Sequence, residues 1–153
     1  MISRIIDQEL QVARLADANI LASIHQECFK KSWGTNSFAA LLSCNLNLCW
    51  LVTKSLPIGF IVVRVIHKEA EILTLAVREK YRRNGVASAL VKHSFYEIKK
   101  LHVNVCYLEG EENNTGAKQL YQKEGFSQIG VRKKYYRYDN DHSEDAKVMS
   151  LNI

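Results

Sequence analysis

A short turn rich in arginine carries the clearest chemical signal in the sequence. Residues 82–87 read RRNGVA, with Gly85 three positions after Arg82 and Ala87 two positions further on. A long stretch with helical periodicity follows, and the first N–H groups of a helix lack intrahelical partners and lie at its partially positive end. A pyrophosphate can satisfy both the donors and the charge. The turn therefore predicts an anion site, to which the arginines add formal charge.

The same turn has a plainer interpretation, in which Gly85 only turns the chain. The pattern R-x-x-G-x-A arises by chance in about one chain in ten of this length. The strand-like residues 72–77 before it and the helical residues 87–101 after it favour the ligand site. A dinucleotide-binding fingerprint is disfavoured because it needs several glycines and an opening strand-helix alternation, and a P-loop is excluded because no GKS or GKT follows.

The cysteines and histidines form no metal or redox pattern. Cys28, Cys44, Cys49 and Cys106 include no C-x-x-C pair, and no histidine lies at zinc-finger spacing from them. We expect reduced, mostly buried thiols and no bound metal, with Cys106 packing in the core rather than acting as a nucleophile. The five histidines have no convincing partners in the sequence, so we assign them no chemistry.

The composition fits one compact domain. The chain has 153 residues, 47% of them hydrophobic, with one proline and no linker or repeat, which predicts a single domain over residues 1–153. The longest apolar runs, residues 46–52 and 58–66, are far shorter than the roughly 20 residues of a membrane span. The N-terminus does not resemble a signal peptide. We therefore expect a cytoplasmic protein without membrane contacts.

The net charge of +5 favours anionic partners such as nucleotides and phosphates. The most basic segment, RKKYYRY at residues 132–138, leads directly into the acidic DNDHSED at residues 139–145. A strand with one solvated face explains the basic segment better than a nucleic-acid site does, so we expect no direct nucleic-acid binding.

The hydrophobic pattern predicts the elements that must position the turn. A first helix follows Asp17 and ends near Lys31, and a short second helix follows Asn36 or Ser37. Strands over residues 48–54, 58–67 and 71–77, with a turn at residues 56–59, form an antiparallel meander. The prediction is completed by a helix over 85–101, a strand over 103–108, a helix capped by Asn113 or Asn114, and a hairpin of strands 127–138 and 146–153. The result is a mixed α/β fold with a mostly antiparallel sheet flanked by helices.

In this setting the RRNGVA turn resembles the coenzyme A pyrophosphate loop of the GCN5-related N-acetyltransferase (GNAT) superfamily, whose pattern is Q/R-x-x-G-x-G/A. The order and spacing of the elements are similar over essentially the whole chain. The resemblance implies the GNAT fold and acetyl-coenzyme A as co-substrate. It implies that the acetyl-pantetheine arm binds to the backbone of Leu75, Ala76 and Val77, and that the pyrophosphate is cradled by Arg83, Asn84, Gly85, Val86, Ala87 and Ser88.

The second half of the chain resembles the RimI-type family, which acetylates the N-terminal alanine of protein eighteen of the small ribosomal subunit. The matching positions are Leu108-Glu109, Asn114 with Ala117, Leu120-Tyr121, Gly125-Phe126, Tyr135-Tyr136, and Glu144-Asp145-Ala146 through to Met149. The resemblance implies that Glu109 is the base, acting through water, that Tyr121 protonates the departing thiolate, and that Asn114 contacts the cofactor. A peptide α-amino group has a pKa of about 7.7 to 8.0, so a modest base suffices.

Other interpretations of these residues stay open. Glu109 stands close to Glu111 and Glu112, and any of them could be a solvated loop charge; Tyr121 could pack its ring in the core with its hydroxyl at the surface. Trp33 either lines the substrate cleft or staples the first helices to the sheet. The acceptor could be a lysine side chain or a small-molecule amine, and a non-catalytic acyl-coenzyme A-binding or ribosome-binding module is a third hypothesis.

Three departures from the family pattern bear on the acceptor. Gly110-Glu111 stands where the family commonly has Val-Arg, which replaces a cation with an anion at the substrate mouth. Arg137 stands where proline commonly follows the paired tyrosines, and Ser32 replaces the proline before Trp33. We expect the cofactor site to be intact, the acceptor to be a protein N-terminus, in the first place that of a small-subunit ribosomal protein, and the peptide preference to differ. The oligomeric state does not follow from the sequence.

Overall fold

The computed structural model describes residues 8–111, 115–137 and 143–153. One seven-stranded sheet runs through the molecule in the order β1-β2-β3-β4-β5-β7-β6. Each pair of neighbouring strands in it is antiparallel except β4 and β5, which are parallel. The strands are β1 (Glu9–Val12), β2 (Asn47–Lys54), β3 (Leu56–Ile66), β4 (Glu69–Val77), β5 (Val105–Glu111), β6 (Ser127–Arg137) and β7 (Ser143–Asn152).

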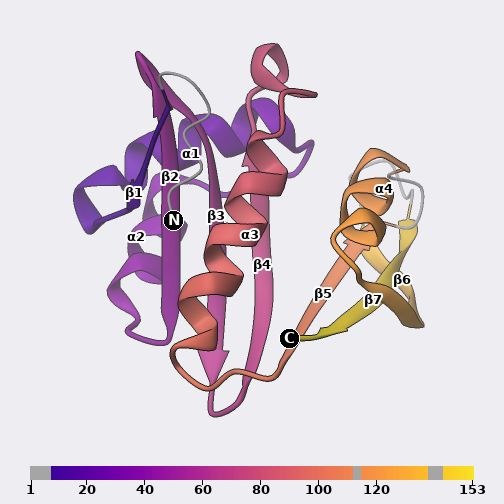
Figure 1. Cartoon of the computed structure of the whole chain (residues 1–153). Coiled ribbons are helices and arrows are strands. Elements are labelled where there is room, and N and C mark those ends of the chain that lie inside the picture. The colour runs from indigo at the N-terminus through magenta and orange to yellow at the C-terminus, as the bar shows by residue number, and fades with distance from the viewer. Residues whose placement is uncertain (1–7, 112–114, 138–142) are drawn as a thin grey trace.

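Helices cover both faces of the sheet. They are α1 (Ala18–Cys28), α2 (Thr35–Ser43), α3 (Val86–Lys99) and α4 (Thr115–Lys123), with the short 3₁₀ turns η1 (Leu15–Asp17) and η2 (Glu79–Tyr81) before α1 and α3. Figure 1 shows α3 in front of strands β2 to β4 and α4 in front of the strands β5, β7 and β6, while α1 and α2 lie behind the first strands. Among the described residues, no helix is both long and apolar enough to cross a membrane.

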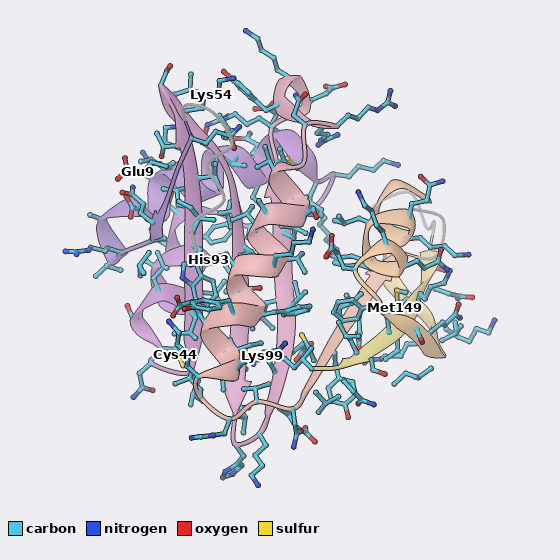
Figure 2. The ribbon with its side chains drawn as sticks, viewed as in Figure 1. Glu9, Cys44, Lys54, His93, Lys99 and Met149 are labelled. Atoms are coloured by element: carbon cyan, nitrogen blue, oxygen red, sulfur yellow. The ribbon has the colours of Figure 1, made fainter. Side chains whose placement is uncertain are left out.

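Two hydrophobic cores follow from the alternation of side chains along the central strands. Ile61 and Val63 of β3 pack in the core on the α3 side, whereas Phe60 and Val62 pack in the core under α1 and α2. Successive side chains of a strand point to opposite faces, so a strand covered on both sides must be apolar throughout. This explains the apolar run at residues 60–63 in the middle of β3. His93, labelled on α3 in Figure 2, places its ring edge-on to Trp50 of β2 at 5.7 Å between centroids.

The predicted fold class, a mixed α/β arrangement with a mostly antiparallel sheet flanked by helices, is confirmed. The order of the predicted helices and strands is also confirmed. The division into a single domain over residues 1–153 stays a prediction.

Three details of the predicted elements are wrong. The short edge strand β1, which pairs with β2, was not predicted, because its polar-apolar alternation spans only four residues and these are mostly exposed. The turn expected at residues 56–59 is at Ser55 instead, and residues 56–59 already belong to β3: Ser55 has a φ of 64°, and Lys54 and Leu56 pair across it. The second helix begins at Thr35, after Gly34, rather than after Asn36 or Ser37. The first helix does follow Asp17 as predicted, although the Asp17 carboxylate accepts a 2.8 Å bond from the Arg14 N–H and does not cap α1.

Candidate active site

The parallel strands β4 and β5 stay together for only four residues. Residues 69–72 of β4 pair with residues 105–108 of β5, and the pairing stops there. Beyond that point β4 continues beside β3 as far as Val77, while β5 continues beside β7 as far as Glu111. The strands therefore diverge (Figure 1). In the described part of the chain, residues 73–77 have no strand partner on the β5 side, so backbone groups of β4 are left for another partner.

A β-bulge in β4 lies where the two strands separate. Val62 pairs with Thr74, but the next residue of β3, Val63, pairs with Ile72, so Leu73 is the extra residue. After the bulge, Ala76 packs in the core under α1 and α2, and Val77 packs in the core on the α3 side. Since both side chains are buried, it is the backbone of these predicted pantetheine-binding residues that can face a ligand.

The predicted pyrophosphate turn forms the start of α3. Gly85 is the N-cap residue in a left-handed conformation, with φ 78° and ψ 8°, and no side chain caps the helix. The first N–H groups of α3 are thus not taken up by a capping side chain. Arg83 is also left-handed, with a φ of 63°, and Asn84 Nδ2 donates to the Arg82 carbonyl at 3.2 Å. Val86 is buried in the core, so only its backbone is available to a ligand.

Side-chain contacts hold this turn against the end of β4. The Val77 carbonyl accepts bonds from Arg82 Nε at 2.9 Å and from Cys28 Sγ at 3.3 Å. Arg82, which we expected to add charge at the turn, therefore also fixes its position. Glu27 of α1 accepts from Arg78 Nη1 at 2.8 Å, and Arg78 Nε donates to the Pro57 carbonyl at 2.9 Å. The connection from β4 to α3 is thus tied to both α1 and β3.

A hydrogen bond joins the predicted cofactor turn to α4. The Ser88 hydroxyl, in the first turn of α3, donates to the carboxylate of Glu124, just after the end of α4. Because α4 carries Tyr121, this contact links the position of the predicted acid to the predicted pyrophosphate site.

The Tyr121 ring packs from α4 against the core. It lies edge-on to Phe126 at 5.6 Å between centroids, and Phe126 in turn contacts Phe95 of α3 at 5.8 Å. Met149 of β7, labelled in Figure 2 in the part of the sheet that α4 covers, belongs to the same core. Tyr121 therefore lies on the α3 side of the sheet.

Glu109 lies on the opposite side of the sheet from Tyr121. Its neighbour Leu108 is buried in the core on the α3 side, so the alternation of β5 directs Glu109 to the other face. Arg132 Nη1 of β6 contacts both carboxylate oxygens, Oε1 at 2.9 Å and Oε2 at 3.0 Å. No role for Arg132 was predicted from the sequence, because its contact with Glu109 spans 23 positions of the chain. Only the register of the predicted hairpin of strands would have indicated this contact.

A depression of about 270 Å³ surrounds Glu109 on this face. Its lining includes three carboxylates, Glu69, Glu71 and Glu109, and one guanidinium, that of Arg64. Together with Arg132, which contacts the Glu109 carboxylate, these groups carry three negative and two positive charges, and the remaining negative charge suits a cationic or amine-bearing molecule.

Trp33 is held by His25 between α1 and α2. The Trp33 N–H donates to His25 Nδ1 at 3.0 Å, and the two rings stack at 4.9 Å between centroids. His25 also stacks on Phe29 at 4.2 Å, and burial lowers the pKa of the imidazole to about 4. These contacts support the stapling role of Trp33. No partner for His25 was predicted from the sequence, because the hydrogen bond comes from a backbone N–H rather than from a side chain.

The remaining predicted residues divide into two groups. Asn114, expected to contact the cofactor, lies outside the described residues. The four cysteines are free thiols, and burial raises the pKa of Cys49 and of Cys106 to about 12, which fits packing rather than nucleophilic chemistry. Within residues 8–111, 115–137 and 143–153, no three or more His, Cys, Asp or Glu side chains form a group that could hold a metal ion.

Comparison with known proteins identifies the class to which this fold and site belong. The profile of the acetyltransferase (GNAT) family matches residues 18–126, and the chain belongs to this family. It is similar to the ribosomal protein bS18-alanine N-acetyltransferase of Escherichia coli K12, with 28% identity over 144 residues that cover 93% of this chain and 97% of the relative. The RimI-type resemblance and the N-acetyltransferase class predicted from the sequence are thereby confirmed.

Solved structures agree with this assignment. The crystal structure of the ribosomal-protein-S18-alanine N-acetyltransferase from Escherichia coli has a TM-score of 0.88 at 27% identity, covering 95% of this chain and 94% of the other. NAA60 of Arabidopsis thaliana in complex with acetyl-CoA has a TM-score of 0.86 at 19% identity, with 95% and 98% covered, and shares the fold.

Proposed function

We propose that this N-acetyltransferase transfers the acetyl group of acetyl-coenzyme A to the N-terminal amine of a protein. The first candidate acceptor is the N-terminal alanine of small-subunit ribosomal protein eighteen, the substrate named for its E. coli relative, which would place the enzyme in the cytoplasm. One observation carries the proposal: Glu109 lies in an acidic depression on β5, close to where β5 separates from β4. A carboxylate in this position can receive the proton of an incoming ammonium group.

The described residues fit acetyl-coenzyme A, which would supply an activated acetyl thioester. Residues 73–77 of β4 offer backbone groups on the diverging edge, and Leu75, Ala76 and Val77 would bind the pantetheine arm there. Gly85 and the uncapped start of α3 offer N–H donors for the pyrophosphate. A backbone N–H of residues 75–77 would polarise the thioester carbonyl.

The two proposed catalytic side chains lie on opposite sides of the sheet. Glu109, on the side of the acidic depression, removes the proton of the acceptor amine through a water molecule. Tyr121, on the side of α3 and α4, donates its hydroxyl proton to the coenzyme A sulfur as the bond to the acetyl carbon breaks. The acceptor thus enters from one face and the thiolate leaves toward the other. The proposed transfer is direct, and Cys106, whose side chain is fully buried, has no role in it as an acyl carrier.

A panel of acceptors tests the proposed reaction. The protein is incubated with acetyl-coenzyme A and peptides that begin with alanine, serine or methionine, and thiol release is followed together with peptide mass. We expect one acetyl group on the α-amine of the alanine peptide. If no peptide causes thiol release, protein N-terminal acetylation is rejected. If only polyamines, aminoglycosides or lysine side chains are acetylated, the acceptor is a small-molecule amine or a lysine.

The variant Tyr121→Phe distinguishes the hypothesis of a catalytic acetyltransferase from that of a non-catalytic binding module. We expect turnover to fall by about 10²-fold, a typical contribution of proton transfer, with coenzyme A binding largely preserved. Tyr96→Phe is the matched control, because Tyr96 lies exposed on α3, where the Lys100 ammonium contacts its ring. Equal activity of Tyr121→Phe and the wild type removes Tyr121 from the proposed mechanism.

A further inference from the structure

We propose that Arg132 is the positioning residue for Glu109, holding its carboxylate in the orientation that the acceptor amine requires. The inference rests on the proposed role of Glu109 as the base. Arg132 touches neither acceptor nor cofactor in this proposal; it acts through the Glu109 carboxylate.

The register of three strands brings the two side chains together. Glu109 of β5 pairs with Val148 of β7, and two residues along β7 Ala146 pairs with Arg132 of β6. Paired residues of neighbouring strands point to the same face, so Arg132 and Glu109 lie on one side of the sheet, two strands apart. Each strand spacing is about 4.8 Å. The arginine side chain therefore has to extend across β7, over the small side chain of Ala146.

The contact constrains the plane of the carboxylate as well as its position. One guanidinium nitrogen, Nη1, lies 2.9 Å from Oε1 and 3.0 Å from Oε2. A bond to only one oxygen would allow the carboxylate to rotate, whereas contact with both oxygens restricts that rotation. Arginine stays charged at every pH at which the enzyme works, so the contact is not lost by titration of the guanidinium.

Exposure of the pair points to a geometric role. The Arg132 side chain is 54% exposed and that of Glu109 is 23% exposed. Ion pairs in contact with water contribute little to folding stability. Loss of Arg132 should therefore leave the fold intact but change the orientation of the Glu109 carboxylate. The rate of acetyl transfer is sensitive to a displacement of this kind.

The local sequence explains why a cation is needed at this place. Glu109 is followed by Gly110 and Glu111, so β5 itself supplies two acidic residues and no basic one over these positions. Arg132 is in register with Glu111 through Ala146. Arg132 of β6 thus supplies the cation that contacts the Glu109 carboxylate.

Lys133 is a matched control on the same strand. It follows Arg132, so its side chain points to the opposite face, where Nζ contacts Asp145 Oδ2 at 3.2 Å. Its side chain is 80% exposed. Lys133→Gln therefore removes the same charge from β6 and breaks a salt bridge without affecting the Glu109 contact.

Steady-state kinetics of Arg132→Gln, Arg132→Lys and Lys133→Gln, with whichever amine the wild type acetylates, test the inference. For Arg132→Gln we expect kcat to fall about 10- to 100-fold, with the KM for acetyl-coenzyme A and the melting temperature unchanged. Arg132→Lys should recover part of the loss, and Lys133→Gln should match the wild type. A normal kcat in Arg132→Gln overturns the inference.

A double-mutant cycle with Glu109→Gln shows whether Arg132 acts through Glu109. In the Glu109→Gln background, Arg132→Gln should cause no further loss, because interacting positions are not additive. An equal fold-loss in both backgrounds overturns the inference.

Crystal structures of the wild type and of Arg132→Gln separate this inference from the proposed function. We expect the Glu109 carboxylate to rotate when the guanidinium is absent, and an unchanged carboxylate rejects the positioning role. If the wild type acetylates no amine, the proposed function fails, while the crystallographic comparison still decides whether Arg132 orients Glu109.

Discussion

The backbone N–H of Trp33 donates a 3.0 Å hydrogen bond to Nδ1 of His25, one helix turn before the end of α1. The acceptor nitrogen must be unprotonated, so this bond exists only with neutral imidazole. His25 is buried and also contacts Phe38 of α2 edge-on at 5.4 Å. One neutral side chain therefore links α1, the α1–α2 loop and α2.

Neutral His25 should make stability depend on pH. Burial lowers its pKa from 6.5 to about 4 in the folded protein, so between these values the unfolded chain binds the proton more tightly. The contribution of neutral His25 to the free energy of unfolding is therefore fully present above about pH 6.5 and is lost as the pH falls toward about 4. Below about pH 4 this contribution changes no further. We expect a loss of about 3 kcal/mol over this window.

Denaturant unfolding of the wild type and of His25→Asn at several pH values measures this dependence. Asparagine keeps an acceptor for the Trp33 N–H but does not titrate. Between pH 4 and 6.5, the folded and ordinary pKa of His25, the free energy of unfolding should therefore change less steeply with pH in His25→Asn than in the wild type. His67→Asn, at an exposed position, is the control. A slope that is the same in His25→Asn and the wild type contradicts the assignment.

Gly85→Ala should weaken coenzyme A binding through backbone strain. The left-handed conformation of Gly85 costs an L residue about 1–2 kcal/mol, although an added Cβ has no atom within 4 Å. Calorimetric titration with coenzyme A should show reduced affinity for Gly85→Ala and a smaller reduction for Gly85→Asn, because asparagine tolerates this conformation better. If the wild type, Gly85→Ala and Gly85→Asn bind coenzyme A with equal affinity, the turn does not take part in binding.

Gly59→Ala, a substitution in β3, should displace the backbone of the neighbouring strand β4. A Cβ at Gly59 would lie 2.9 Å from the Ala76 carbonyl oxygen, which is backbone and cannot turn aside. We expect a stability loss of about 1–3 kcal/mol and weaker coenzyme A binding, measured by thermal unfolding and calorimetry. Gly130→Ala is the control, since a Cβ there meets no atom within 4 Å. If Gly59→Ala and Gly130→Ala behave alike, the close approach of β3 to Ala76 is not significant.

Thr74→Val should raise the stability of the protein without ligand. Thr74 is buried next to the bulge, and its Oγ1 has no hydrogen-bond partner among the described residues. An unsatisfied buried hydroxyl costs about 1–3 kcal/mol, and valine has nearly the same shape. Chemical denaturation should therefore give an equal or higher free energy of unfolding, and a clear decrease would show that the hydroxyl has a partner.

The helices, most strands and the cofactor turn could be predicted because their signals are local. The apolar residues of α3 recur at helical spacing, and β3 is a mostly apolar stretch that follows a turn. Gly85 marks the start of α3 because few other residues adopt its conformation. The alternation of β1 covers only four mostly exposed residues, too few to predict a strand, and its pairing with β2 makes it one.

The candidate site was predictable only in part, because strand register determines much of it. Glu109 and Tyr121 were assigned from a resemblance of local sequence, but their placement on opposite sides of the sheet depends on which face of β5 is buried. The partner of Glu109 depends on the pairing of β5 with β7 and of β7 with β6, which brings together positions 23 residues apart.

The sequence by itself determined the family, the order of the main elements and the anion-binding turn, because periodicity, capping glycine and motif spacing are properties of neighbouring residues. Tertiary structure decided where β4 and β5 separate, through the bulge at Leu73 and the end of pairing at Ile72. It also decided that Arg132 contacts Glu109 and that His25 holds Trp33. These contacts depend on the register and packing of distant segments, which no local pattern specifies.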